Sequence, residues 1–140
     1  MKYQSDLNQI PSCPPVHCIQ AVRESYRFVF DPLDQKSFLP QGKKNPQRVH
    51  KEENDVKKCS LLGLSMFTSE ADACNHYKKL KKYMKNIDKT IGSHLATGTI
   101  QPHHGLISEP SESGHFDLFE CAGVDLTLDF RVMYELSGNI

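Results

Sequence analysis

The chain has 140 residues, of which 38% are hydrophobic and 24% charged, and its formal net charge is zero. This length accommodates one domain that buries about two-thirds of its unfolded surface. No apolar run approaches the ~20 residues that cross a bilayer, which excludes a membrane-spanning helix. The first 15 residues lack the apolar core of a signal peptide. We therefore expect a soluble protein of the cytoplasm.

The zero net charge conceals an uneven distribution. Residues 1–90 contain 16 Lys and Arg against 10 Asp and Glu, whereas residues 91–140 contain Arg131 alone against seven acids. Such asymmetry can mark an anionic partner for the basic half. Attraction between the two halves within one fold is the favoured explanation, because surface charge alone says little about a specific partner.

The cysteines are odd in number and irregular in spacing, at positions 13, 18, 59, 74 and 121. Disulfide frameworks are typical of secreted domains with paired cysteines. Without a signal peptide, we expect these residues to be reduced thiols.

The first third of the chain alternates between ordered and irregular patterns. Residues 1–15 contain three prolines and few apolar anchors, which predicts an irregular arm. The alternating aromatic residues of 25–30 (SYRFVF) predict a strand. Residues 31–58 are mostly polar and interrupted by Pro and Gly, which predicts a long basic loop that is functional, disordered or both. The apolar segment 59–67 (CSLLGLSMF) then predicts a buried strand.

The clearest element is an amphipathic helix over residues 68–87. Ser69 and Asp72 have the spacing of a capping box at its start. Apolar residues spaced by four and three positions form one face, while most lysines lie off it. That face comprises Ala73, Tyr77, Leu80, Met84 and Ile87. We predict that this face packs on a sheet.

Three later segments predict strands: residues 93–100, 114–121 and 124–136. The last one alternates strictly between apolar and polar residues, which is typical of a half-buried antiparallel strand. The whole pattern predicts an α+β fold, in which about five mostly antiparallel strands are covered by one long helix. We expect a single domain over residues 16–140, preceded by the arm.

Histidines gather around the segment 101–115, which lies between two predicted strands. His103 and His104 occupy a glycine-bracketed loop, and His115 opens the next strand, so we predict a binding loop on a stiff scaffold. His103 and His104 are adjacent, so on extended backbone their side chains should point apart. The strand face that starts at His115 also carries Asp117. This face is either a row of metal ligands or a solvent-facing edge, and we predict no metal site, because such clusters are often incidental.

Several basic residues are candidate contacts for phosphate groups. The loop supplies three of them and the helix two, and no base-reading motif accompanies them, so any nucleic-acid binding would be independent of sequence. They are Lys43, Lys44, Arg48, Lys78 and Lys82. A solvated charged surface is the simpler interpretation.

Three residues occur in the chain order of a known family. Arg27 lies in YRFVF, Ser65 in LSMFTSE and Glu120 at the end of GHFDLFE. In this order the chain resembles the arginine–serine–glutamate type of ADP-ribosyltransferase over about residues 25–136. The resemblance implies a mostly β fold, NAD held by Arg27 and Ser65, and Glu120 as a catalytic residue that supports a ribosyl-cation transition state.

The favoured function is that of a small cytosolic module that binds a protein partner or a small ligand and needs no cofactor. One alternative is an NAD-dependent ADP-ribosyltransferase-like enzyme, or an inactive relative of one. The other is sequence-independent nucleic-acid binding through the basic half.

Overall fold

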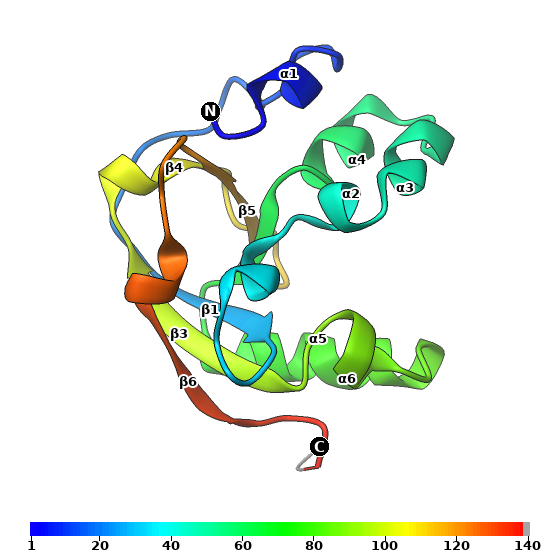
Figure 1. Ribbon diagram of the computed structural model, residues 1–140, viewed down its shortest axis with the longest axis vertical. Coiled ribbons are helices and arrows are strands. Elements are labelled where there is room, and N and C mark those ends of the chain that lie inside the picture. The colour runs from blue at the N-terminus through cyan, green and yellow to red at the C-terminus, as the bar shows by residue number, and fades with distance from the viewer. Residues whose placement is uncertain (139–140) are drawn as a thin grey trace.

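A computed structural model describes residues 1–138 of the protein and contains one antiparallel sheet of six strands (Figure 1). The strand order is β4-β5-β2-β1-β3-β6. The strands are β1 (Arg23–Val29), β2 (Leu64–Phe67), β3 (His94–Ile100), β4 (Gly105–Ile107), β5 (His115–Glu120) and β6 (Phe130–Glu135). The α+β prediction is confirmed. The strand that it lacked is β4, which forms inside the predicted histidine loop.

The sheet consists of two halves that meet at a single position. β1 pairs with β3 over its whole length, but its pairing with β2 is limited to Tyr26 and Phe67. Beyond that position β1 and β2 separate, so backbone groups that would bond each other in a continuous sheet need other partners. The halves β4-β5-β2 and β1-β3-β6 therefore flank a gap in the ladder.

The predicted long helix is present as α5 (Glu70–Tyr83), and the side chain of its N-cap Ser69 accepts a hydrogen bond from the backbone N–H of Asp72. The helix ends at Tyr83 rather than at residue 87, because Met84 adopts an extended conformation. Ile87 then begins a separate helix, α6 (Ile87–Thr90), and is buried in the same apolar cluster as α5. Two helices thus satisfy the apolar spacing that we attributed to one. Among residues 1–138, no helix is both long and apolar enough to cross a membrane.

Both faces of the sheet are covered by apolar side chains. On one face α5 and α6 pack against β1, β2 and β3, and the Tyr77 hydroxyl donates a hydrogen bond to the carbonyl of Gly92 at 2.8 Å. On the other face, side chains of two short 3₁₀ helices, η1 (Gln35–Phe38) and η3 (Leu126–Leu128), complete the core. That core contains Val29, Phe38, Leu64, Met66, Ala96, Ile100, Ile107, Phe116, Leu118, Leu126 and Phe130.

The segment 31–58, predicted as a long basic loop, is largely helical. It contains η1, α2 (Gln41–Lys44), α3 (Pro46–Lys51) and α4 (Asp55–Ser60). Pro46 occupies the first turn of α3, where a missing N–H costs nothing, and the Asn54 side chain caps α4. Pro46 and Asn54, polar or helix-breaking residues of the kind that predicted a loop, therefore lie at the starts of short helices. Because Cys59 and Ser60 complete α4, the strand predicted from residue 59 begins only at Leu64.

The predicted strand 124–136 is shorter than its alternation indicates. Its first part forms η3, in which the Asp125 side chain accepts a hydrogen bond from the backbone N–H of Thr127. Leu128 is 82% exposed, so the alternation does not correspond to a buried strand face there. The strand itself is β6.

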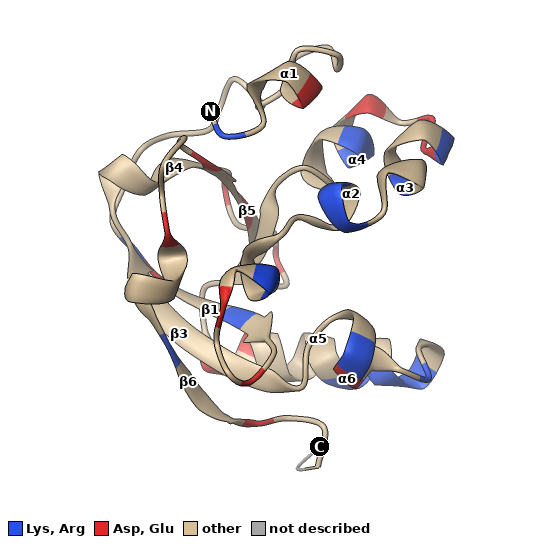
Figure 2. Cartoon of the chain, viewed as in Figure 1, with Lys and Arg blue, Asp and Glu red and all other residues tan. Residues whose placement is uncertain are grey.

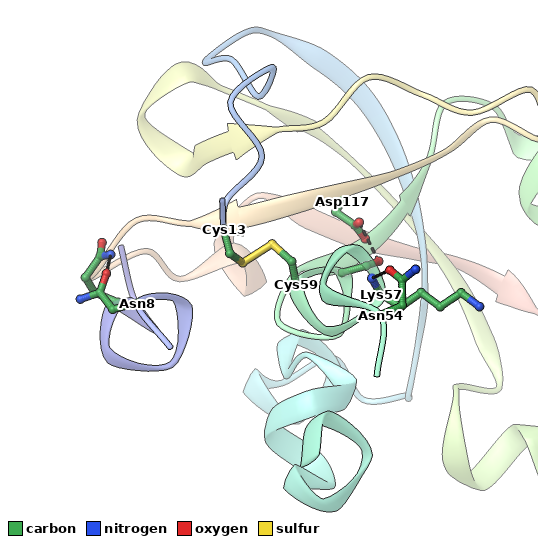
Figure 3. The surroundings of a disulfide bond; sticks show 8 residues. Asn8, Cys13, Asn54, Lys57, Cys59 and Asp117 are labelled. Atoms are coloured by element: carbon green, nitrogen blue, oxygen red, sulfur yellow. Dashed lines mark hydrogen bonds between the residues drawn. A yellow bond between two sulfur atoms is a disulfide. The ribbon is translucent and has the colours of Figure 1, made fainter. Parts of the chain in front are cut away.

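The N-terminal arm is attached to the domain by apolar packing and a covalent bond. It contains the short helix α1 (Gln4–Leu7), and Leu7 and Ile10 are buried against α4 and β5 residues. Cys13 forms a disulfide with Cys59 of α4, as Figure 3 shows. The expectation of reduced thiols is wrong for these two residues, because the fold brings their Cα atoms to 5.6 Å, a bridging distance that spacing along the chain cannot reveal. Cys18, Cys74 and Cys121 are free.

Candidate functional site

A cleft lies where the two halves of the sheet separate. Its walls come from α2, α3 and α4 on one side and from α5 on the other, the two groups of helices on the right of Figure 1. Its volume is about 370 Å³, within the range of pockets that hold small molecules. The cleft is the candidate site.

Arg27 and Ser65, predicted to act together, both line this cleft. The Arg27 guanidinium fills the gap between β1 and β2: its Nη1 donates to the Ser65 carbonyl at 2.8 Å, and its Nε donates to the Ser37 carbonyl at 2.9 Å. Burial lowers the pKa of Arg27 to about 10, opposed by the charges of Glu120 and Asp117. Arg27 therefore remains a cation at neutral pH, held in a fixed position.

The polar lining of the cleft favours anions. It includes two arginines, two histidines and four serines: Arg27, Arg48, His76, His115, Ser60, Ser65, Ser111 and Ser113. In the described part of the chain, no Asp or Glu lines it. Figure 2 shows further Lys and Arg residues on the helices at both sides, together with some Asp and Glu. Because Lys and Arg outnumber Asp and Glu on these helices, the surroundings of the cleft carry a net positive charge, as its lining does.

Ser65 and His115 line the cleft and form a cluster with Asp117, which is buried and does not line it. Ser65 Oγ is 3.0 Å from His115 Nε2, and the same nitrogen is 3.7 Å from Asp117 Oδ1. The other oxygen of Asp117 accepts a hydrogen bond from the Ser60 hydroxyl at 2.8 Å, beside the disulfide-bonded α4 (Figure 3). Oδ1 is buried and has no hydrogen-bond partner.

Burial shifts the pKa of both titratable groups in this cluster in the direction that favours the uncharged form of each side chain. It lowers the pKa of His115 and raises the pKa of Asp117 to about 6, although the Ser60 hydrogen bond and the Arg27 charge oppose the second shift. The contact between His115 and Asp117 is therefore not a full ion pair at neutral pH, since His115 is then mostly uncharged.

The α5 side of the cleft is mainly apolar. This side is lined by His76 and by four apolar residues, Phe28, Phe67, Leu80 and Ile91. The ring centroids of His76 and Phe67 are 5.1 Å apart. Burial lowers the pKa of His76, and the charges of His115 and Lys79 lower it further. This wall can receive an aromatic ring.

Glu120 lies outside the cleft. It lines a separate cavity of about 330 Å³ beside Lys2 and Val124, and Lys2 Nζ contacts its Oε2 at 2.9 Å. Burial raises the pKa of Glu120, opposed chiefly by the hydrogen bond and charge of Lys2. Of the three residues that the family resemblance indicated, the structure thus brings Arg27 and Ser65 together. Glu120 lies apart from them, and its charge acts on Arg27 by raising the pKa of the guanidinium.

The five basic candidates are dispersed. Lys43 Nζ forms an ion pair with Asp6 Oδ2 at 2.9 Å, and Lys44 Nζ lies over the ring of Phe30, so both lysines already have contacts within the fold. Lys78 and Lys82 are exposed on α5, outside the cleft. Arg48, on α3, is the one member of this group that lines it.

The three histidines of the predicted binding loop have different environments. His104 is 1% exposed. Its Nδ1 accepts a hydrogen bond from the backbone N–H of Gln101, and its Nε2 lies 3.0 Å from Asp129 Oδ2, so its role is structural. The side chains of His103 and His104 do not point apart: their ring centroids are 4.3 Å from each other, because residues 102–104 form a 3₁₀ helix. His115 alone reaches the cleft.

Sequence reasoning missed His76 and gave Asp117 no role beyond a strand face. His76 directly precedes the buried Tyr77 on the helix, a position that carries no signal by itself. For Asp117 the available signal was its i, i+2 spacing from His115 on one strand face, but the position of Ser65 opposite Asp117 follows only from the pairing of β2 with β5.

Among residues 1–138, no group of three or more His, Cys, Asp and Glu side chains is arranged to hold a metal ion. No family model matches the chain, and no curated protein and no solved structure is significantly similar to it.

Proposed function

We propose that the protein binds a small phosphate ester with an aromatic group, of the nucleotide class, in the cleft between α3 and α5. The observation that carries this proposal is the presence of Arg27 and Arg48 in a cavity without a lining carboxylate in the described part of the chain. Guanidinium groups match phosphate oxygens in geometry and charge.

The two arginines serve different purposes. Arg27 is buried and fixed by two backbone carbonyls, so it supplies a permanent positive charge at the base. Arg48 is exposed on α3, so its planar fork is accessible to two phosphate oxygens. The hydroxyls of Ser111 and Ser113 add neutral donors at the rim.

The apolar wall supports the aromatic part of the ligand. Leu80 and Ile91 are half-buried and offer apolar surface to the cleft, and the buried rings of Phe28 and Phe67 lie behind them. A mostly apolar wall with a few directed polar groups is typical of small-molecule sites. A nucleoside monophosphate combines the required charge and ring.

Calorimetric titration with AMP tests the proposal. Arg48→Ala should weaken AMP binding roughly 10- to 100-fold, because a hydrogen bond to a charged group contributes about 1.5–3 kcal/mol. Arg131→Ala removes an exposed arginine of β6 that does not line the cleft, so it should leave the affinity unchanged. Adenosine should bind more weakly than AMP. Equal affinity for AMP and adenosine, or an unaffected Arg48→Ala variant, would contradict the proposal.

A second candidate function is NAD cleavage, as the resemblance to ADP-ribosyltransferases implies. One observation favours it: Arg27 and Ser65, the residues implied to hold NAD, are in hydrogen-bond contact at the cleft. Glu120 lies in a separate cavity and is paired with Lys2, so NAD cleavage would require a rearrangement that brings its carboxylate to the cleft.

The test of this candidate separates binding from turnover. Glu120→Gln should leave NAD affinity nearly intact while abolishing nicotinamide release, because the carboxylate would meet positive charge that develops only in the transition state. Wild-type protein that binds NAD and releases no nicotinamide would reject cleavage while supporting nucleotide binding.

A further inference from the structure

The sheet itself positions the Ser65–His115–Asp117 cluster. In the pairing of β2 with β5, Ser65 lies opposite Asp117, and His115 is two residues earlier on the same strand. Residues at this spacing project from the same face of a sheet, so their geometry is set by the backbone ladder rather than by a mobile loop. Sites on strands hold their groups more accurately than sites on loops.

The unpartnered oxygen of Asp117 fits a proton transfer. Buried acceptors normally have hydrogen-bond partners, and an exception calls for an explanation. Asp117 Oδ1 has none, yet it lies 3.7 Å from His115 Nε2. If Nε2 takes the proton of the Ser65 hydroxyl, an imidazolium forms beside this oxygen. The contact is then stronger after the transfer than before it, which is the condition for accelerating a reaction.

We propose that Ser65 is a nucleophile toward the phosphorus of a small phosphate monoester, with His115 as its general base and Asp117 as the carboxylate that stabilises the imidazolium. This inference rests on the proposed binding of a phosphate ester and adds a reaction to it.

The reaction needs only the ester and water. Ser65 Oγ forms a bond to phosphorus and passes its proton to His115 Nε2, while the bond from phosphorus to the leaving oxygen breaks. That oxygen takes the proton from Nε2 and departs as an alcohol, leaving phosphoserine. Water then attacks the phosphorus and passes a proton to Nε2, the bond to Ser65 Oγ breaks, and Nε2 returns the proton to Oγ. The products are the alcohol and inorganic phosphate.

The surroundings suit each step. Burial lowers the pKa of His115, so its imidazole is available as a base at neutral pH. Arg27 donates to the carbonyl of Ser65 itself, which places a cation beside the nucleophile. Together with Arg48 it can stabilise the charge spread over the transferring phosphoryl oxygens.

The chain contains a second serine–histidine–carboxylate set that provides a matched control. Ser93 Oγ is 2.8 Å from His94 Nδ1, and His94 Nε2 is 3.8 Å from Asp31 Oδ2. Neither Ser93 nor His94 lines the cleft, and Asp31 is exposed. Short distances alone therefore do not distinguish the two sets, and the inference depends on the cationic cleft around Ser65.

The experiment uses p-nitrophenyl phosphate, which joins a phosphate to an aromatic ring. Wild-type protein should release p-nitrophenol, and acid-quenched samples should carry one phosphoryl group that peptide mapping assigns to Ser65. Ser65→Ala should abolish both signals, and its fold should survive, since the exposed Ser65 hydroxyl contacts only His115 among the hydrogen bonds described. His115→Gln should lower kcat roughly 10²- to 10⁴-fold. Ser93→Ala should match wild type.

Asp117 acts through His115, so its test must separate catalysis from structure. Asp117→Asn should lower kcat roughly tenfold or more with KM nearly unchanged, because it weakens a contact made in the transition state. A change confined to KM would reject its role.

The outcomes distinguish this inference from the proposed function. If AMP binds calorimetrically but p-nitrophenyl phosphate is neither cleaved nor bound covalently, the nucleophile is rejected and the ligand class stands. If Ser65→Ala retains turnover, the nucleophile is likewise rejected. If Ser65 is phosphorylated although AMP does not bind, the catalytic inference stands and the nucleotide class fails.

Discussion

The disulfide between Cys13 and Cys59 allows a quantitative prediction of stability. It closes a loop with a sequence separation of 46 residues. In the chain-entropy description, removing such a cross-link costs about 4 kcal/mol of the free energy of unfolding at 25 °C. This value is large beside the 5–15 kcal/mol that is usual for a domain. We expect Cys13→Ala to lose most of it, since the remaining Cys59 thiol stays a well-packed apolar group.

Urea denaturation of wild-type and Cys13→Ala protein, each with and without a reducing agent, measures the loss. For m-values of about 1–3 kcal/mol/M, a loss of about 4 kcal/mol lowers the wild-type midpoint by roughly 1.3–4 M on reduction. The Cys13→Ala midpoint should not respond to the reductant. Thiol titration of the denatured, unreduced protein should find Cys18, Cys74 and Cys121 only. Five titratable thiols, or a wild-type midpoint insensitive to reduction, would refute the reasoning.

Three further predictions concern stability. Tyr77→Phe removes a buried hydrogen bond and should cost about 1–3 kcal/mol in urea melts, whereas Tyr83→Phe, at an 86% exposed position, should change stability by less than about 0.5 kcal/mol. Ser69→Ala removes the helix cap of α5 and should cost about 0.5–2 kcal/mol, while Asn86→Ala, which removes a side chain that makes no cap bond, should cost less; equal losses would contradict the cap. Burial raises the pKa of Asp117 from 3.8 to about 6, so the stability it contributes is complete below pH 3.8 and is lost as the pH rises through 6. Wild-type protein should therefore lose stability between pH 4 and pH 7 relative to Asp117→Asn, and parallel pH profiles would contradict the shift.

The helix and the sheet could be predicted wherever a local pattern coincided with burial. Ala73 and Tyr77 are fully buried, as their helical spacing indicated, and Ser69 caps α5. The same rule failed over residues 124–128, where alternation continued into a 3₁₀ helix that leaves Leu128 in solvent. Alternation records the chemistry of side chains, and only packing decides which of them a strand buries.

The candidate site could be predicted in part. Arg27 and Ser65 were associated through residue order, and they are in hydrogen-bond contact. The cluster of Ser65 with His115 and Asp117 depends on the register of β2 against β5, which no local pattern specifies. Glu120 projects from β5 to the opposite face from Asp117, where Lys2 meets it, because neighbouring positions of a strand alternate between faces.

The sequence by itself determined the α+β class, the capped amphipathic helix and most strands, because helical and strand periodicities and capping residues act within a few positions of the chain. Tertiary structure alone decided the pairing of Cys13 with Cys59, the separation of β1 from β2, and the cleft that Arg27 and Arg48 share. Each of these joins residues far apart in the chain. Such contacts arise from how the apolar faces of all elements are buried together, and that choice is made by the whole chain at once.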